Sequence, residues 1–566
     1  MDEQGTSLLD ALREQLQCHS VKDGCSPQGQ CGCCTVWIDG AARVACVTAL
    51  RRVAGRSVTT VEGLPLSLRA RWVDAFAASG ASQCGFCTPG IVLRLAALEG
   101  GSAAPTRQAV ESALLAHLCR CTGWQSIVEA GCAALGIGDP GPATPSRQPP
   151  SPSAPVDRLL SSWRAQIEGP LYQSSGPDVI LGGGGFADDT APRSSLVQLG
   201  AAGGPPAPSL AAARGAAGKV QGRNSTVPLS HPVAVPDGVW ALTLQTTWVE
   251  PAYLEPDASW CRPGGEPASP LANGGAFGGK RRSPVPTRAR SLADEWQSPV
   301  RVLWCREDVV RHGPKRPPLA LGLRPDGSGV VRIGRTPGSP DLGDLRARVL
   351  AVAPGLVLEE VEVAGPPVGP DLRGVGWVEV LAAQHALRAR QARRGVGGDA
   401  DAGDAGDAGD AGEAGAARVE VAVPDGGRAA VSLRTRGGPY GRGAVLAEVW
   451  AGELLDEVTL RSYVLGAVHQ ALGLVWAEGI AVDGDGAPLD LTIRSFGILA
   501  ARDMPQVDVV LHQEDRWPVN GSDAVFAATV AAAWIAEGTP PRWPTRRAAG
   551  RRGRAAAASG AGEETG

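Results

Sequence analysis

The sequence has no strong excess of charge of either sign and no long apolar run. Its formal net charge is −4 and its isoelectric point is near 6.1, so no overall basic field favours nucleic acid or anionic lipid as a partner. The sequence contains no stretch of about 18 apolar residues, the length needed to cross a bilayer. The opening residues, MDEQGTSLLDALREQL, are acidic and amphipathic, unlike a secretory signal. We therefore expect a soluble, cytoplasmic protein that binds neither nucleic acid nor membrane.

Cysteine is scarce over most of the chain but concentrated near its start. Eleven of the 13 cysteines lie before residue 133. Thiols crowded in this way in an intracellular chain favour metal ligation over disulfides, with buried structural thiols as the alternative. At 566 residues, the chain is long enough for about three or four folded units.

Hydrophobic patterning predicts a strand-rich segment followed by a helical one. Residues 7–17 have helical spacing with Ser7 as a cap, and the strand 35–38 ends at a hairpin turn, Asp39-Gly40, before its return strand at 41–47. Further helices are expected at 71–78, 89–98, 106–118, 125–135, 460–478 and 524–536. Further strands are expected at 179–181 and 417–423.

Three segments have compositions that cannot build a core. Residues 137–156 are rich in Pro and Ser, which predicts an extended linker. Residues 397–417 repeat Gly-Asp-Ala and are expected to be disordered. Residues 546–566 are basic and then rich in Ala and Gly, which predicts a disordered, solvated tail.

The first group of cysteines lies on and beside one loop. Its members are Cys25, Cys31, Cys33, Cys34 and Cys46. Three thiolates on a tight loop with a fourth on the return strand suit a 2Fe–2S cluster. Gly29 and Gly32 would let backbone amides approach the cluster sulfurs. Zinc is the alternative, although the spacing is poor for a zinc finger.

Two further cysteine pairs stand where predicted helices begin or end. They are Cys84 with Cys87 and Cys119 with Cys121. Two antiparallel helical pairs can therefore bring four thiolates together. A Cys-x-x-Cys pair alone is shared with zinc knuckles and redox dithiols, so the flanking residues must decide.

The flanking residues resemble a known family. QCGFCTPG at 83–90 and LCRCTGW at 118–124 resemble the helical iron–sulfur domain of the xanthine dehydrogenase and aldehyde oxidase family, the molybdenum hydroxylases. KDGCSPQGQCGCCTVWIDG at 22–40 resembles that family's plant-type ferredoxin domain, and the resemblance covers nearly all of 7–135. It implies two 2Fe–2S clusters, with the ligand sets Cys25, Cys31, Cys34 and Cys46, and Cys84, Cys87, Cys119 and Cys121.

The first loop departs from the family pattern. Five residues separate Cys25 from Cys31 where the family has four. Cys33 competes with Cys34 as the third ligand, although the family's register favours Cys34. Cys18, Cys33 and Cys132 are then expected to be ordinary thiols.

Fragments of the remaining chain resemble the family's molybdopterin-binding subunit. They are YLEP at 253–256, GGAFGGK at 274–280, LRGVG at 372–376 and the region 460–515. The resemblance implies that Gly275, Phe277, Gly278 and Arg373 bind molybdopterin. Two other interpretations of the glycine loop remain, a plain turn and a phosphate-binding P-loop, although Arg281 stands where a P-loop needs Ser or Thr.

The catalytic residue is unknown from the sequence. The family uses a glutamate in a Gly-x-Gly-Glu setting near the C-terminus as a base. Residues 518–526 read PVNGSDAVF and contain no glutamate. Asp523 is a weak substitute candidate with a shorter reach, and capping of the helix 524–536 is the favoured alternative role.

We therefore predict a multidomain α+β protein. It comprises a β-grasp plant-type ferredoxin domain at 1–65, a four-helix 2Fe–2S domain at 66–136, the linker at 137–156, a compressed α+β molybdopterin-binding-like region at 157–396 and 418–545, and the two disordered segments.

The expected function is that of an iron–sulfur, molybdopterin-containing oxidoreductase component. Electrons from hydroxylation of a purine, an aldehyde or an N-heterocycle would leave through the two clusters. The chain has no FAD domain, so the resemblance implies a separate FAD subunit and a further molybdenum subunit for the missing segments. The alternative is a non-catalytic electron-transfer subunit whose degenerate molybdenum domain is a docking scaffold, and a zinc-bound structural protein is a third interpretation.

Overall fold

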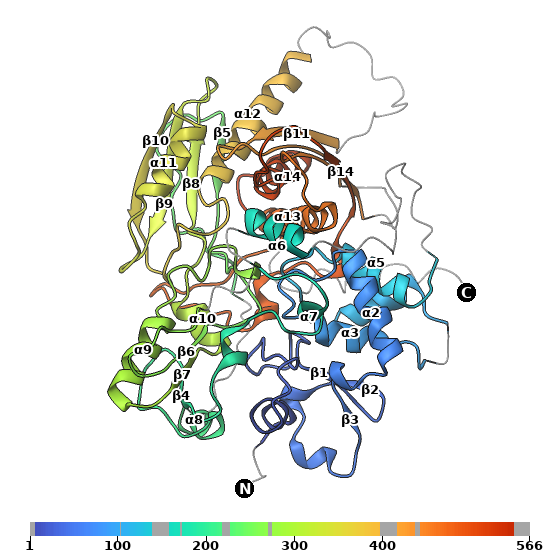
Figure 1. The fold of residues 1–566 in the computed structure, drawn as a ribbon. Coiled ribbons are helices and arrows are strands. Elements are labelled where there is room, and N and C mark those ends of the chain that lie inside the picture. Colours follow the sequence, from blue (N-terminus) through green and yellow to red (C-terminus); the bar gives the residue numbers. More distant parts are fainter. Residues whose placement is uncertain are drawn as a thin grey trace, which may run out of the picture.

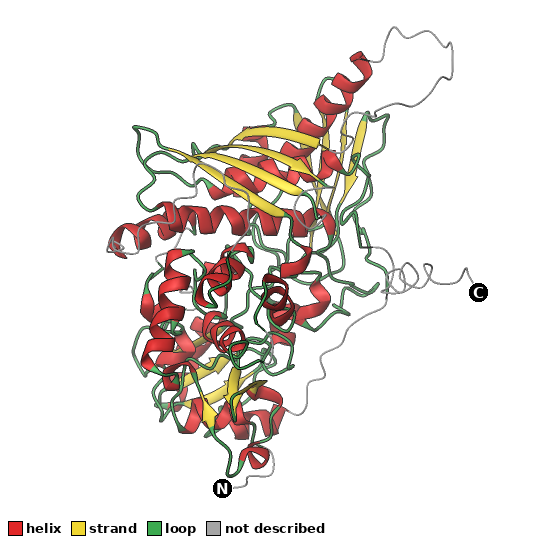
Figure 2. Cartoon of the chain, turned by 90° about the vertical axis from the view of Figure 1, so that its right-hand side faces the viewer, coloured by secondary structure: helices red, strands yellow, loops and turns green. Residues whose placement is uncertain are grey.

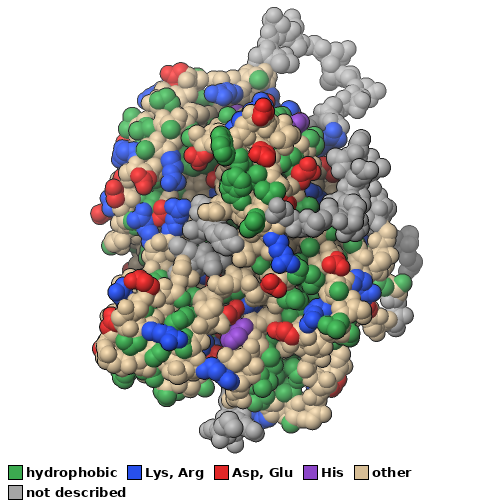
Figure 3. Space-filling view, viewed as in Figure 1, with side chains coloured by type: hydrophobic (Ala, Val, Ile, Leu, Met, Phe, Trp, Pro, Cys, Tyr) green, Lys and Arg blue, Asp and Glu red, His purple; other side chains and the backbone are tan. Residues whose placement is uncertain are grey.

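The computed structural model describes residues 6–101, 104–138, 158–169, 173–217, 227–269, 274–396, 416–435 and 442–547. Almost all of the expected linker, Gly-Asp-Ala repeat and tail lie outside the described residues. No helix in these ranges is long and apolar enough to cross a membrane. On the face in Figure 3, acidic and basic side chains are interspersed, which agrees with the small net charge.

The N-terminal part contains a small sheet of order β2-β1-β3. The elements are α1 (Leu8–Asp10), a π-helix (Ala11–Gln15), β1 (Thr35–Ile38), β2 (Ala41–Val44) and β3 (Val58–Thr59). Asp39 and Gly40 both have positive φ, +50° and +78°, as a tight two-residue hairpin turn requires. The predicted hairpin is therefore confirmed, and so is the Ser7 cap, whose hydroxyl accepts from the Asp10 N–H at 3.1 Å.

The next part is helical, as predicted. Its helices are α2 (Leu66–Ala78), α3 (Thr88–Ala96), α4 (Arg107–Leu114) and α5 (Gln125–Ala134). Helix α2 packs on α5, and α4 contacts both α3 and α5. Their shared interior includes Trp72, Ile91 and Ile127, which are fully buried. Trp37 of β1 donates to the Leu93 carbonyl at 2.7 Å, which ties this part to the small sheet.

The central part holds two mixed sheets, of orders β4-β7-β6 and β10-β9-β8-β5. Its strands are β4 (Leu196–Leu199), β5 (Leu242–Gln245), β6 (Ala258–Cys261), β7 (Val300–Leu303), β8 (Leu319–Leu323), β9 (Gly329–Arg335) and β10 (Leu356–Glu362). Its helices are α6 (Arg158–Glu168), α7 (Pro177–Ile180), α8 (Leu210–Ala217), α9 (Val285–Trp296), α10 (Arg306–His312) and α11 (Gly343–Val352). The expected strand at 179–181 is wrong, because Pro177 follows Gly176 and begins a helical turn there.

The C-terminal part is a four-stranded sheet covered by helices. Its elements are α12 (Trp377–Val396), β11 (Ala416–Ala422), β12 (Arg428–Arg434), β13 (Ala444–Trp450), α13 (Glu457–Trp476), β14 (Gln506–His512) and α14 (Ser522–Ala536). Figures 1 and 2 show α13 and α14 beneath this sheet, and α14 packs on β11, β12 and α13. Both helices are buried around most of their circumference, since α14 is apolar on all sides and α13 buries the polar Ser462, His469 and Gln470 along with its apolar residues.

The helical thiol-bearing part docks against this C-terminal core. The Trp124 indole donates to the Leu499 carbonyl at 2.9 Å, and the Gln125 amide exchanges hydrogen bonds with the Val507 backbone at 2.8 and 2.9 Å. These contacts join segments more than 370 residues apart, so the cysteine-rich part forms one packed body with the remainder. The fold is a mixed α and β multidomain protein, and the β-grasp and four-helix-domain assignments stay predictions.

Candidate metal centres and active-site cavity

The first group of thiols gathers around the loop before β1. The Cys25 thiol contacts those of Cys31 and Cys46, and Cys46 also contacts Cys34. All three of the loop residues and Cys46 are buried. Cys25 Sγ accepts from the N–H groups of Gln28 and Gln30, at 3.2 and 3.5 Å. Backbone donors thus point at sulfur, as a thiolate ligand set needs.

The second group of thiols comes from the segment just before α3 and from the segment between α4 and α5. Cys84 and Cys121 have their sulfurs 3.6 Å apart, and Cys87 contacts Cys119. The Cys119 sulfur also lies 3.2 Å from the Thr122 hydroxyl, within hydrogen-bond distance. All four thiols are buried, and Cys87 is the residue directly before α3.

Crowding shifts the pKa values of neighbouring thiols in opposite directions. Hydrogen bonds from Cys31 and Cys46 hold the pKa of Cys25 well below its usual range, while the bond to Cys25 holds the pKa of Cys31 well above it. In the second group, Cys121 and Cys87 in the same way lower the pKa of Cys119. Four thiolates cannot remain together in such a buried space without cationic charge between them, so the donor sets fit iron–sulfur clusters.

The arrangement suits two-iron clusters better than a single metal ion. Among the described residues, no three His, Cys, Asp or Glu side chains converge closely enough to hold one ion. A 2Fe–2S cluster takes two thiolates on each iron, so its ligands form two pairs. In the first group Cys25 contacts Cys31 and Cys46, Cys46 contacts Cys34, and Cys31 also contacts Cys33. In the second group Cys84 contacts Cys121, and Cys119 contacts both Cys87 and Cys121.

The two thiol groups are joined by a short backbone contact. The Leu118 N–H, one residue before Cys119, donates to the Cys31 carbonyl at 2.9 Å. Gly32 has φ +77°, and a Cβ there would lie 2.5 Å from the ring of His117. The glycine predicted to admit backbone amides near sulfur therefore also allows the two loops to approach each other.

The predicted molybdenum-site residues lie around a cavity of about 450 Å³. Phe277, Gly278, Arg373 and Asp523 line it, whereas Gly275 lies in the adjoining 3₁₀ turn and does not. Gly278 has φ +92°, and a Cβ there would lie 1.9 Å from the Asp371 carbonyl oxygen. Glycine is thus required where the 274–280 loop meets the 372–376 segment.

Arg373 organises one wall of this cavity. Its guanidinium donates to the Asp523 carboxylate at 2.7 Å and lies over the rings of Phe277 and Phe526, at 5.1 and 5.3 Å from their centroids. Burial raises the pKa of Asp523, and the Arg373 charge partly counteracts that rise. An aromatic cradle around a cation with a neighbouring carboxylate can hold an anionic group and accept a proton.

The favoured capping role for Asp523 is wrong. Gly521 occupies the N-cap of α14 and makes no side-chain cap. The Asn520 side chain accepts from the Asp523 N–H at 2.9 Å, and Glu168 accepts from Gly521 and Ser522 at 3.1 and 2.8 Å. Other residues satisfy the helix end, so the Asp523 carboxylate is available to Arg373.

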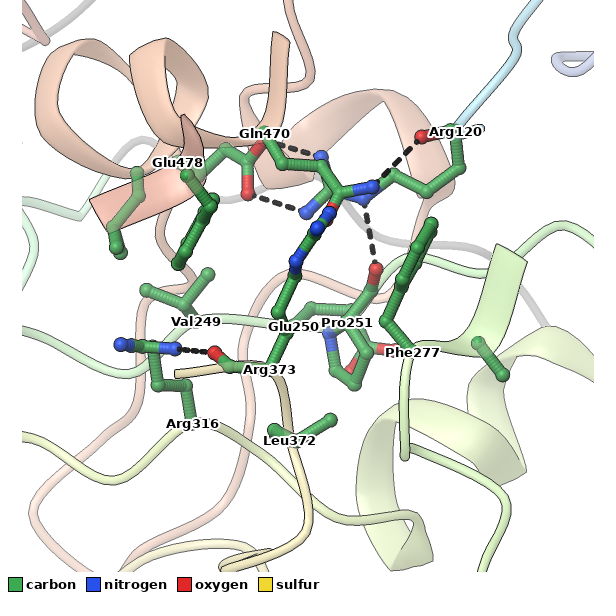
Figure 4. A pocket seen from close by; sticks show the side chains of 13 residues that line it. Arg120, Val249, Glu250, Pro251, Phe277, Arg316, Leu372, Arg373, Gln470 and Glu478 are labelled. Atoms are coloured by element: carbon green, nitrogen blue, oxygen red, sulfur yellow. Dashed lines mark hydrogen bonds and ion pairs between the residues drawn. The ribbon is translucent and has the colours of Figure 1, made fainter. Parts of the chain in front are cut away.

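A smaller cavity of about 50 Å³ adjoins this wall. It shares Phe277, Leu372 and Arg373 with the larger cavity and reaches Arg120, which stands between Cys119 and Cys121. Figure 4 shows the Arg120 guanidinium between the Glu478 carboxylate and the Pro251 carbonyl, to which its Nε donates at 3.0 Å. Gln470 also donates to the Arg120 carbonyl at 3.3 Å.

Sequence reasoning missed Arg120, Glu478 and Gln470 as site residues. Arg120 carried a signal, because it lies inside the LCRCTGW motif. Glu478 and Gln470 carried none, because they come from α13 and its following turn, about 350 residues away in sequence.

The P-loop interpretation of the 274–280 loop does not agree with the position of its lysine. Lys280, which would contact phosphate in a P-loop, is buried and donates to Glu255 at 2.7 Å.

Comparison with known proteins places these features in a family. The model of the [2Fe-2S] binding domain matches residues 60–132. The chain is 39% identical over 127 residues to a probable xanthine dehydrogenase subunit of Bacillus subtilis, covering 22% of this chain and 73% of that one. It is 41% identical over 127 residues to the xanthine dehydrogenase iron-sulfur-binding subunit of Escherichia coli O157:H7, covering 22% and 79%.

Solved structures extend the likeness in fold beyond that segment. The aldehyde oxidoreductase of Desulfovibrio gigas matches with a TM-score of 0.65 and 15% identity over 95% of this chain and 96% of that one. The aldehyde oxidoreductase of Desulfovibrio desulfuricans matches with a TM-score of 0.66 and 15% identity over 96% of this chain and 97% of that one. At this identity the likeness concerns the fold alone, whereas the sequence relatives establish descent. The chain belongs to the molybdenum hydroxylase family of xanthine dehydrogenases and aldehyde oxidoreductases.

Proposed function

We propose that the chain is the iron–sulfur and molybdopterin component of a xanthine dehydrogenase-type oxidoreductase. The observation that carries the proposal is the continuity of the site. The larger cavity shares a wall with the smaller one, and the smaller one ends at Arg120, between two cysteines of the second thiol group. Electrons taken from a substrate in the cavity thus have a packed route toward the clusters.

In this proposal the eight paired cysteines hold two 2Fe–2S clusters. Cys84, Cys87, Cys119 and Cys121 form the cluster nearer the cavity, and Cys25, Cys31, Cys34 and Cys46 form the outer one. The chain's contribution is to bury the thiolates and aim backbone N–H groups at sulfur, which sets the cluster potentials. The Leu118-to-Cys31 hydrogen bond joins the two loops that would hold the clusters.

Phe277, Gly278 and Arg373 would hold molybdopterin in the cavity, and Gly275 would contribute only from the adjoining turn. That group, when bound, supplies the metal that accepts electrons from the substrate carbon. Gly278 allows close backbone approach, and the Phe277 ring and the Arg373 guanidinium form the wall shared with the smaller cavity. The donor set at this wall suits an anionic, planar ligand, so the residues fit the cofactor.

Asp523 is our candidate for the proton acceptor. Its carboxylate lines the cavity, and burial raises its pKa against the opposing effect of Arg373. Glu168 lines the same cavity, but its oxygens accept from Gly521, Ser522 and Arg164, so its role is to position the start of α14.

The proposal includes partners and a compartment. A separate FAD subunit would accept the electrons, a further molybdenum subunit would supply missing segments, and the substrate would be a purine, an aldehyde or an N-heterocycle. The relatives named as subunits of larger enzymes support this assembly. Crowded reduced thiols favour the cytoplasm.

A second candidate function is a non-catalytic electron-transfer subunit with the cavity as a degenerate docking scaffold. The observation that favours it is that Asp523, the candidate base, is already bound in an ion pair with Arg373. Asp523 also stands where the family has a glutamate, which has the longer side chain. Measurement of molybdenum, extractable pterin and substrate-dependent dye reduction in anaerobically purified protein separates the two. Molybdenum with turnover supports the enzyme, whereas iron without molybdenum supports the carrier.

A further inference from the structure

Two arginines at the mouth of the larger cavity have no acidic partner in the described part of the chain. Arg281 follows the glycine loop, and Arg348 lies in the middle of α11; both line the cavity and both are exposed. Within the described ranges, neither guanidinium forms a hydrogen bond or an ion pair with a carboxylate.

Arginines close to these two in the sequence do form ion pairs with carboxylates. Arg282, next to Arg281, donates to Asp371 at 2.6 Å. Arg346, two residues before Arg348, contacts Glu360 at 3.4 Å and is not a lining residue. Of the three described arginines that line the cavity, Arg373 is paired with Asp523, whereas Arg281 and Arg348 have no carboxylate partner.

The cavity's own carboxylates do not neutralise them. Four acidic residues line the cavity, and three are engaged, since Asp371 binds Arg282, Asp523 binds Arg373 and Glu168 binds Arg164. Asp425, on the turn after β11, is the one lining carboxylate that has no ion pair within the described residues. The described part of the mouth therefore has two free positive charges against one free negative charge.

Two aromatic side chains line the cavity. Phe277 forms the inner end, where the cavity meets the smaller one shown in Figure 4, and Trp377 lies on the wall at the start of α12. A volume of about 450 Å³ lies within the usual range for sites that bind small organic molecules. Aromatic walls with two guanidinia at the open end suit a planar ring that carries an anionic group.

We propose that Arg281 and Arg348 make the cavity selective for aromatic or heteroaromatic substrates that carry a carboxylate. The inference rests on the proposed function and names its substrate class. A cofactor phosphate is the other anion that could reach guanidinia. The substrate is favoured because the two arginines are exposed, whereas the predicted cofactor residues Phe277 and Arg373 lie at the end that adjoins the smaller cavity.

The test is equilibrium binding to the full chain, measured by calorimetry at low salt. The probes are benzoate and benzamide, which have similar shape and differ in charge. We expect wild-type protein to bind benzoate at least about tenfold more tightly than benzamide, because charge-assisted bonds to guanidinium are strong. The double variant R281Q/R348Q should lose that preference while its affinity for benzamide stays unchanged.

The control is R346Q, which removes an arginine from the same helix outside the cavity and should leave both affinities unaltered. Equal binding of the two probes by wild type, or an unchanged preference in R281Q/R348Q, would overturn the inference. Loss of pterin from R281Q/R348Q would also overturn it, by assigning the arginines to cofactor phosphate. Failure of the proposed function is distinguishable, because it would appear as wild-type protein without molybdenum that still prefers benzoate.

Discussion

Replacement of Glu478 by Gln should destabilise the protein strongly, because it breaks a buried ion pair. The side chains of Arg120 and Glu478 are only 8% and 2% exposed, and one further bond, from Nη2 to Oε2, is 2.8 Å long. Removing one partner of such a pair leaves an uncompensated charge and typically costs about 3–5 kcal/mol. Since Gln keeps one acceptor oxygen, we expect the lower limit, about 3 kcal/mol.

The assay is loss of the visible iron–sulfur absorbance on titration with urea. With a denaturant dependence of about 3 kcal/mol per M, a cost of about 3 kcal/mol lowers the apparent midpoint by about 1 M. The matched control is E99Q, which breaks the Arg71–Glu99 pair in the same helical part, where the side chains are 49% and 34% exposed. Exposed pairs contribute about 0–1 kcal/mol, so its midpoint should move by less than about 0.3 M.

Equal shifts for E478Q and E99Q would refute the reasoning, since burial would then have no part in the effect. A further variant, R120M/E478L, removes both charges and should recover most of the lost stability. If the double variant is as unstable as E478Q, the pair stabilises the fold through its specific geometry and not through charge balance.

The same structural contacts lead to three other expected outcomes. Gly278→Ala should cost more than about 2 kcal/mol, because its Cβ would meet a backbone oxygen at 1.9 Å, whereas Gly327→Ala, also at positive φ but in open space, should cost about 1 kcal/mol in the same titration. Burial alone would raise the pKa of Asp188, but the guanidinium groups of Arg301 and Arg13 outweigh burial and hold that pKa at about 2. The ionised carboxylate therefore stabilises the folded state at neutral pH, and D188N should lower the free energy of unfolding there by about 2 kcal/mol. D523N should keep its iron while substrate-dependent dye reduction falls at least about 100-fold; unchanged turnover would remove Asp523 as the base.

The hairpin and several helices could be predicted because their structure depends on residues that are close together in the sequence. The hairpin after Thr35 follows from alternating residues and an Asp-Gly turn, and the helices that flank the thiols follow from 3.6-residue spacing. The apolar stretch at 179–181 misled the prediction, because its composition favours a strand while Pro177 begins a helical turn.

The site was predictable only where a motif carried it. The thiols and the glycine loop have recognisable spacing, whereas the partner of Asp523 is Arg373, which is 150 residues away in the chain. A local rule therefore favoured helix capping for Asp523. The Arg120–Glu478 pair spans 358 residues and has no local signature, because only tertiary packing brings its members together.

The assignment of two 2Fe–2S clusters to eight paired cysteines underlies every other step of the proposed function. Its most direct test is iron analysis with electron paramagnetic resonance of anaerobically purified, dithionite-reduced protein and of its C87S and C31S variants. We predict about four iron atoms per chain and two distinct signals in wild type, with a different signal lost in each variant. A single signal, or zinc in place of iron, would contradict the assignment.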